Sequence, residues 1–305
     1  MEAYRALEAC FARMAAIEDA IGILSWDRET TMPLGAAEGR AEQIATLDVM
    51  AHELLTAPEL GERLDRAEAE AAQLDPWQAA NLREMRRRRL HATAVPPALV
   101  EARSKAASRC EVAWRAARAD NDFPSLLPLL THVLTCEREV AEAKGAALGL
   151  SPYDALLDGY DPGMRQATID PLFADLRADL PGLIGEALEA QAGRPPVPAM
   201  AGPFPTDIQR GVGERVMTVL GFDTGRGRLD TSTHPFCGGA TDDVRLTSRY
   251  REDDFTSALM GILHETGHGL YEQGLPREWR HQPVGRARGM SMHESQSLLI
   301  EMQVC

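Results

Sequence analysis

The segment from Phe255 to Tyr271 constrains this chain more than any other. It reads FTSALMGILHETGHGLY and is largely apolar, yet it contains His264, Glu265 and His268 in the order His-Glu-x-x-His. In an α-helix, residues four apart lie one turn above each other, so both imidazoles would project from one face and could bind one cation. Burying these polar groups among apolar residues is unfavourable unless something charged compensates them. The segment therefore predicts a buried helix that carries two metal ligands, with a hydrogen-bonded core histidine pair as the alternative.

The position of the glutamate indicates which chemistry such a helix would support. Glu265 lies beside the two imidazoles rather than between them. A zinc ion bound by two histidines polarises a water molecule, and a neighbouring carboxylate can take its proton, which is the chemistry of a metallopeptidase. Gly267 and Gly269 flank the second histidine although each weakens a helix by about 1 kcal/mol relative to Ala. We expect another backbone to approach closely there, from a packed neighbour or a bound peptide.

A third protein ligand is expected elsewhere, because catalytic zinc sites normally use three and leave one position for water. The next suitable group is Glu294, which stands 26 residues beyond His268 and just ahead of the apolar run 298–300. Another interpretation of Glu294 is a capping box, in which Ser291 begins a helix and Glu294 bonds back to it.

The residues before the metal-binding segment predict a small β element. Val244, Leu246 and Ser248 alternate with polar residues, which is the period of a strand, and we expect one or two short strands here after a loop over 221–230. A strand edge beside the metal helix could pair with an extended peptide. Arg245 could then bind a carboxylate and His234 could donate to the oxyanion. Alternatively, Arg245 pairs with a neighbouring aspartate and His234 braces the turn at its following proline.

The remainder of the chain indicates a mainly helical protein. Residues 1–150 show apolar positions three and four apart, interrupted at prolines, and predict roughly five antiparallel helices. Further helices are expected around 172–188 and over 206–220, and Ser151 and Asp161 are expected to bound a short one. A proline-rich stretch at 191–206 predicts a linker between an N-terminal helical region, 1–190, and a metal-site region of the same catalytic domain, 207–305.

Charge and composition exclude several classes of partner and compartment. A formal net charge of −14 argues against nucleic acid and anionic membranes as partners. The N-terminal residues are interrupted by charges where a signal peptide needs an apolar core, and no run of about 18 apolar residues could span a membrane. Five scattered cysteines form no Cys-x-x-Cys pair, which fits a reducing cytoplasm.

Six motifs together resemble the thermostable carboxypeptidase family, the Taq-type or M32 metallocarboxypeptidases. They are SWDRETTMPLGAAEGRAEQ at 25–43, SPYDALLDGYDPGM at 151–164, HPF at 234–236, DVRLT at 243–247, HETGH at 264–268 and HESQS at 293–297. The resemblance implies a mainly α, zincin-like metallopeptidase with a small β element beside the metal-binding helix. It implies Zn²⁺ or Co²⁺ held by His264, His268 and Glu294, with Glu265 as general base. It further implies a peptide substrate shortened one residue at a time from its C-terminus, and a homodimer.

The chain departs from the family pattern at its C-terminal end. The later family motifs, Ile-Arg-x-x-Ala-Asp and Gly-x-x-Gln-Asp-x-His-Trp, have no counterpart, and the final residues LLIEMQVC contain no helix-ending signal. We therefore expect a form truncated at the C-terminus. Two other hypotheses remain: another two-histidine, one-glutamate peptidase, such as an oligopeptidase, and a non-catalytic form that binds a metal or a peptide.

Overall fold

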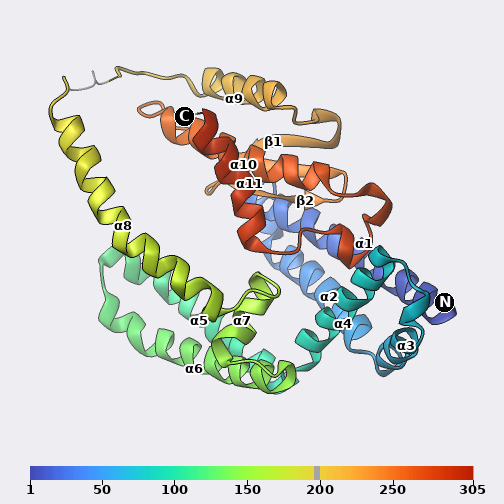
Figure 1. The fold of residues 1–305 in the computed structure, drawn as a ribbon. Coiled ribbons are helices and arrows are strands. Elements are labelled where there is room, and N and C mark those ends of the chain that lie inside the picture. The colour runs from blue at the N-terminus through green and yellow to red at the C-terminus, as the bar shows by residue number, and fades with distance from the viewer. Residues whose placement is uncertain (196–199, 305) are drawn as a thin grey trace. The chain divides into compact units, whose positions relative to one another are not determined.

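The computed structural model describes residues 1–195 and 200–304, which form two compact units. Unit 1 combines Met1–Arg86 with the described part of Val197–Cys305, and unit 2 is Arg87–Pro196. In Figure 1 the blue N-terminal helices and the orange to red C-terminal elements thus belong to one unit. The division of domains at 191–206 stays a prediction, because residues 196–199 of that stretch lie outside the described residues.

Unit 1 is mainly helical. Its helices are α1 (Glu2–Thr30), α2 (Ala37–Thr56), α3 (Pro58–Ala69), α9 (Thr206–Leu220), α10 (Thr256–Gly274) and α11 (Met290–Val304), and α4 (Pro76–Thr93) begins in it. Leu7, Phe11 and Met14 follow one another at helical spacing and place one face of α1 in the core. There they join Leu60 and Leu64 of α3 in one buried cluster. Short 3₁₀ turns connect these elements: η1 (Leu34–Ala36), η2 (Ala71–Gln73), η3 (Thr224–Arg226), η4 (Arg277–Trp279) and η5 (Pro283–Gly285).

The β element is a three-stranded sheet in the order β1-β3-β2. Its strands are β1 (Gly227–Thr231), β2 (Phe236–Ala240) and β3 (Asp243–Ser248); β1 runs parallel to β3 and β2 runs antiparallel to it. The strand predicted from the alternation of Val244, Leu246 and Ser248 is confirmed as β3, but the loop expected over 221–230 is wrong from Gly227 onward. Leu229 explains the difference, because it is buried in the same cluster as Val244 and Leu246 and draws its segment into the sheet.

The sheet order also corrects the expected strand edge. Since β3 is the central strand and pairs on both sides, the strand that carries Arg245 offers no free edge to a peptide. The outer strand β2 instead packs against α1 and α10. Its approach to α1 is so close that a Cβ on Gly22 would lie 2.1 Å from the carbonyl oxygen of Gly239.

Helix α10 covers one face of the sheet. Ile262 of α10 shares a buried cluster with Leu246 of β3 and Met217 of α9. A Cβ on Gly269 would lie 2.7 Å from the ring of Phe222, so this side of α10 is in close contact with the layer beneath it. The predicted buried helix is confirmed, and so is a small β element beside it.

Unit 2 is entirely helical in its described residues, with α5 (Pro97–Asp120), α6 (Phe123–Leu148), α7 (Pro152–Tyr160) and α8 (Gln166–Ala192). As predicted, Ser151 begins α7, and its hydroxyl accepts a hydrogen bond from the backbone N–H of Asp154. Six α-helices, rather than five, occupy residues 1–150. Among the helices of the described ranges, none is both long and apolar enough to cross a membrane. The fold class is therefore the predicted one, mainly α with a small sheet.

Candidate metal centre

Two helices that lie side by side in unit 1, α10 and α11, supply the candidate metal ligands (Figure 1). His264 and His268 occupy successive turns of α10, and their rings lie 4.9 Å apart between centroids. A Cβ on Gly267 would lie 2.5 Å from the carbonyl oxygen of Gln296 and 2.5 Å from the Cα of Ser297. The expected close approach of another backbone is therefore made by α11, and it brings the two helices together beside the histidines.

Glu294 projects from the first turns of α11 toward both imidazoles. Its Oε2 atom lies 3.5 Å from His264 Nε2 and 3.6 Å from His268 Nε2. The buried hydroxyl of Ser297 donates to the same oxygen at 2.9 Å and fixes the carboxylate. Because α11 begins at Met290, Ser291 lies within its first turn and not at its N-cap, and the Glu294 carboxylate faces the histidines instead of a capping box.

These three side chains fit a tetrahedral divalent cation. Their ligand atoms all lie within 4.8 Å of one another. Ligands about 2.1 Å from a tetrahedral centre are separated by about 3.4 Å, close to the two distances between Glu294 and the histidines. Two neutral imidazoles and one carboxylate are also the donor set that such a cation prefers when a fourth position is left open. The arrangement can therefore hold a metal without rearranging the helices.

A second carboxylate of α11 orients the first histidine. Glu301 stands two helical turns after Glu294, and its Oε2 atom accepts a hydrogen bond from His264 Nδ1 at 2.9 Å. With the proton on Nδ1, the lone pair of Nε2 points toward Glu294 and is free for a metal. Such partners of ligand histidines fix the tautomer and raise the basicity of the ligand.

His268 is oriented by a histidine and a glutamate in sequence. Its Nδ1 atom lies 2.5 Å from Nδ1 of His293, and His293 Nε2 lies 2.7 Å from Glu272 Oε1. One assignment satisfies all three groups: His268 Nδ1–H donates to His293, and His293 Nε2–H donates to the carboxylate. Nε2 of His268 is then left for the metal.

The pKa values of His268 and Glu265 suit metal binding and proton transfer, respectively. Burial lowers the pKa of His268, with the nearby His293 and His264 adding to the effect, so the ring stays neutral. Burial raises the pKa of Glu265 to about 7, and the Glu294 carboxylate also raises it, while His264 and His293 oppose the shift. Glu265 is only 7% exposed. A carboxylate with a pKa near neutrality is well suited to accept a proton and to release it again.

The two predicted substrate-binding residues lie in different places. His234 is exposed and precedes Pro235, and a Cβ on Gly261 of α10 would lie 3.4 Å from Pro235, so His234 stands near the turn of α10 before His264. The backbone carbonyl of His234 accepts a 2.5 Å hydrogen bond from Ser232, which braces the turn.

Arg245 is not brought to the metal centre. Leu246, the next residue, faces α10, so Arg245 lies on the opposite face of the sheet. Its guanidinium carbon sits 4.0 Å from the ring centroid of Trp26 in α1, and it donates to both carboxylate oxygens of Asp243, at 3.0 and 2.7 Å. The arrangement favours a structural role for Arg245.

Sequence reasoning missed the residues that orient the ligands, although two of them leave a signal. Glu272 continues the four-residue series of His264 and His268 on α10, and Glu301 lies seven residues after Glu294 on α11. Both spacings place a carboxylate on the face that carries the ligands. The His293 contact depends on how the two helices cross and leaves no such signal.

A mainly helical fold with His264, Glu265, His268 and Glu294 gathered on two adjacent helices is that of an HExxH metallopeptidase. The family model described as carboxypeptidase Taq (M32) metallopeptidase matches residues 6–305. This chain belongs to that family.

Curated relatives and solved structures agree with this assignment. Thermostable carboxypeptidase 1 of Thermus thermophilus is 40% identical over 298 residues, which cover 94% of this chain and 58% of the relative. The structure titled Trypanosoma cruzi metallocarboxypeptidase 1 superposes with a TM-score of 0.96 at 36% identity, over 100% of this chain and 61% of that one. An M32 carboxypeptidase from Deinococcus radiodurans R1 gives a TM-score of 0.92 at 34% identity, over 100% and 60%. The chain therefore spans about three fifths of the length of these relatives.

Proposed function

We propose that this chain is the metal-binding part of a zinc-dependent metallocarboxypeptidase that releases single residues from the C-termini of peptides. The observation that carries the proposal is the convergence of His264, His268 and Glu294 within 4.8 Å, with the buried Glu265 beside them. Family membership supports the carboxypeptidase reaction, and the relatives' names state it for those proteins.

Each residue of the centre has a defined task in this proposal. His264, His268 and Glu294 hold Zn²⁺, with Co²⁺ as an alternative metal. A divalent ion bound there would polarise a water molecule and the carbonyl of the peptide bond. Glu265 accepts the proton of the attacking water and passes it to the leaving amine.

A direct substrate role is more plausible for His234 than for Arg245. We propose that the exposed His234, whose neighbour Pro235 contacts α10 at Gly261, donates to the developing oxyanion. Arg245 would have to leave both Trp26 and Asp243 to reach a substrate carboxylate.

The reaction can be tested by incubating the 305-residue chain, loaded with zinc or cobalt, with an N-acetylated peptide and following the products by mass spectrometry. A ladder of products, each shorter by one C-terminal residue, is expected. The matched variant Glu265→Gln should keep its zinc and lose at least about 100-fold in rate, because it can no longer take the proton. Full turnover by Glu265→Gln would show that the base is assigned wrongly.

The same assay separates the two alternative functions. Internal cleavage of the blocked peptide would indicate an oligopeptidase with the same ligand set. Zinc binding without any cleavage would indicate a non-catalytic form that binds a metal or a peptide. Unchanged zinc content after Glu294→Ala would exclude Glu294 as a ligand.

The assembly and compartment are further proposals. We propose a homodimer on the basis of the family resemblance, which light scattering of the purified protein can test. A cytoplasmic location is supported by the cysteines, since Cys10, Cys110, Cys136 and Cys237 are free thiols.

A further inference from the structure

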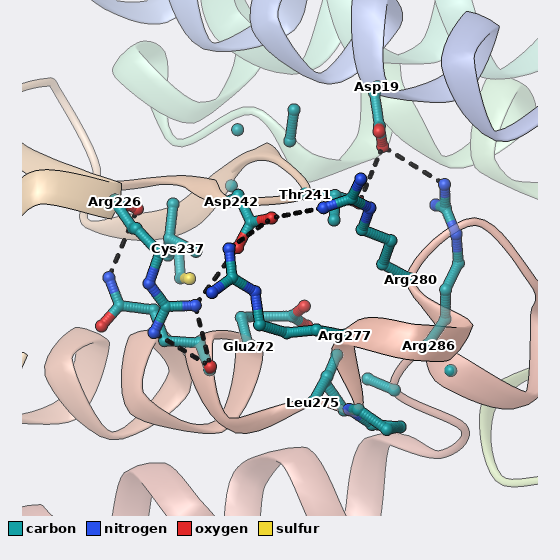
Figure 2. A pocket seen from close by; sticks show the side chains of 18 of the residues that line it. Asp19, Arg226, Cys237, Thr241, Asp242, Glu272, Leu275, Arg277, Arg280 and Arg286 are labelled. Carbon is teal, nitrogen blue, oxygen red and sulfur yellow. Dashed lines mark hydrogen bonds and ion pairs between the residues drawn. The ribbon is translucent and has the colours of Figure 1, made fainter. Parts of the chain in front are cut away.

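Unit 1 contains a cavity of about 320 Å³ next to the metal centre. The outer strand β2 forms one wall with Cys237–Ala240, and the end of α10 forms another with Glu272 and Gln273. The connection between α10 and α11 closes it with Leu275, Pro276 and three arginines (Figure 2). His293, which orients His268, also lines the cavity.

Four arginines line this cavity, in a chain whose net charge is −14. They are Arg226 from η3, Arg277 from η4, and Arg280 and Arg286 from the connection to α11. Figure 2 shows Arg277 and Arg280 directed toward Asp242, and Arg286 directed toward Asp19. The cavity thus has two charged ends.

At the Asp242 end, three guanidinium groups share one carboxylate. Asp242 Oδ1 accepts from Arg226 at 3.2 Å, and Oδ2 lies 3.4 Å from both Arg277 Nη2 and Arg280 Nη1. Charge-assisted hydrogen bonds of this kind are normally about 2.7–2.9 Å long. The two bonds to Oδ2 are therefore weak, and neither arginine is held tightly.

The other charged side chains of the cavity have more than one partner or a closer one. Arg226 also donates to Asp223 and to the backbone carbonyl of Gln273. Arg286 is paired with Asp19 at 3.2 Å and with Glu18 at 3.4 Å, and Glu272 bonds to His293. Arg277 and Arg280 consequently share a single counterion, Asp242, which Arg226 also contacts.

We propose that this end of the cavity is a binding site for a small multivalent oxyanion of the phosphate type. Arg277 uses only Nη2 on Asp242 and Arg280 only Nη1, so each guanidinium keeps further N–H donors with which it could bind a ligand. Two forks that meet at one point suit a tetrahedral dianion, which accepts from both at once. Their side chains are 64% and 49% exposed, so the ligand can enter from solvent.

Binding of inorganic phosphate to the full 305-residue chain tests this site. Isothermal titration at pH 7.5 should show saturable binding, with sodium chloride adjusted to keep the ionic strength constant. The double variant Arg277→Ala, Arg280→Ala should bind at least tenfold more weakly, because both donor forks are removed. Arg251→Ala is the control, since Arg251 is also exposed and paired with one aspartate, Asp253, but does not line the cavity; it should bind like the unmodified chain.

Three results would overturn the proposal: no saturable binding, equal binding by the double variant, or an equal response to chloride alone. Zinc content and circular dichroism of the double variant show whether the centre and the fold persist. Should that variant fail to fold, Arg277→Ala alone removes the more exposed guanidinium, and a loss of less than about twofold in phosphate affinity would contradict the assignment.

Discussion

Two carboxylates of the candidate metal centre, Glu265 and Glu301, differ in their burial and in their contacts. Glu265 is buried, which raises its pKa to about 7 and lets it exchange a proton near neutral pH. Glu301 accepts a hydrogen bond from His264 Nδ1–H and so keeps Nε2 directed at Glu294. Two glutamates within one site are thus distinguished by their contacts and burial.

Removing the orienting carboxylate should weaken metal binding without removing a ligand. We expect Glu301→Ala to lower zinc affinity by about tenfold, because His264 loses the partner that fixes its tautomer and its ring. Competition with a chromophoric chelator measures the change. Glu252→Ala, an exposed glutamate of unit 1, is the control and should leave the affinity unchanged. An unaltered zinc affinity in Glu301→Ala would show that His264 is held without this bond.

Helical spacing predicts which side chains share one face of a helix. It does not predict which side chains meet when they come from segments far apart in the sequence. The four-residue spacing of His264 and His268 is a local property, so the sequence predicts that they share a face. Trp26 stands more than 200 positions before Arg245, and nothing in either segment indicates that the two side chains stack. The arginine cavity was missed for the same reason, since its walls come from α1, the sheet and the connection between α10 and α11.

Among the elements, the pair α10 and α11 determines whether the metal centre exists. The helices touch at Gly267, where a side chain would meet the backbone of Gln296 and Ser297 at 2.5 Å. Because Glu294 stands one turn before Ser297 on the same helix, the distance between the helices sets the distance between the ligands.

Adding one methyl group at this contact should therefore damage the site. In Gly267→Ala the two backbones must separate, and we expect a loss of about 1–3 kcal/mol in the free energy of unfolding together with at least tenfold weaker zinc binding. Chemical denaturation and chelator competition give the two quantities.

Gly274→Ala is the matched control on the same helix, because nothing lies within 4 Å of its added Cβ. It should change neither quantity appreciably. Zinc affinity preserved in Gly267→Ala would show that the helix separation does not control the ligands.

Most elements were predictable, and the exceptions involve pairing between strands. The helix expected over 206–220 is α9, the alternation of Val244, Leu246 and Ser248 indicates β3, and Ser151 and Asp161 mark the ends of α7. The segment at 227–231 contains glycine and charged residues and does not indicate a strand by itself. It becomes one because β3 offers a parallel partner in register, Leu229 opposite Leu246.

For the whole molecule, the two compact units divide the functions of the chain unequally. All three candidate ligands and the arginine cavity lie in unit 1, which combines the first and last parts of the sequence. Proline breaks predicted where helices end but could not locate this division, because α4 runs without interruption from one unit into the other.

Unit 2 has its own buried polar centre at Asp158. The carboxylate accepts from Arg165 at 3.0 Å and from the Gly163 backbone at 3.1 Å, and it contacts His91 Nε2 at 3.0 Å. Burial raises the pKa of Asp158, but the bonds from His91, Gly163 and Arg165 outweigh it, and the pKa falls below its usual value of 3.8.

This shift gives unit 2 a predictable dependence on pH. A pKa lowered by folding adds stability above pH 4 that is lost as the pH falls through the folded-state value. Asp158→Asn should therefore lower the free energy of unfolding of unit 2 by about 2–3 kcal/mol at pH 7, and the difference from the unmodified chain should shrink below pH 4. Hydrogen exchange of α6 and α7 measures it.

The exposed Asp175 of α8 supplies the control for this experiment. Asp175→Asn should leave hydrogen exchange unchanged at both pH values. A constant difference between Asp158→Asn and the unmodified chain across the pH range would mean that the charge of Asp158 is not what stabilises the unit.

The contact at Gly267 also determines how the metal centre senses the rest of unit 1. At Gly267 the backbones of the two helices meet without an intervening side chain, and Glu294 belongs to α11, so a shift of α11 directly changes the distance from Glu294 to the histidines of α10. Changes far from the histidines, in the connection that carries the arginines or in the sheet beneath α10, can therefore alter metal occupancy while every ligand stays intact. Metal content should then report whether the packing of unit 1 is intact.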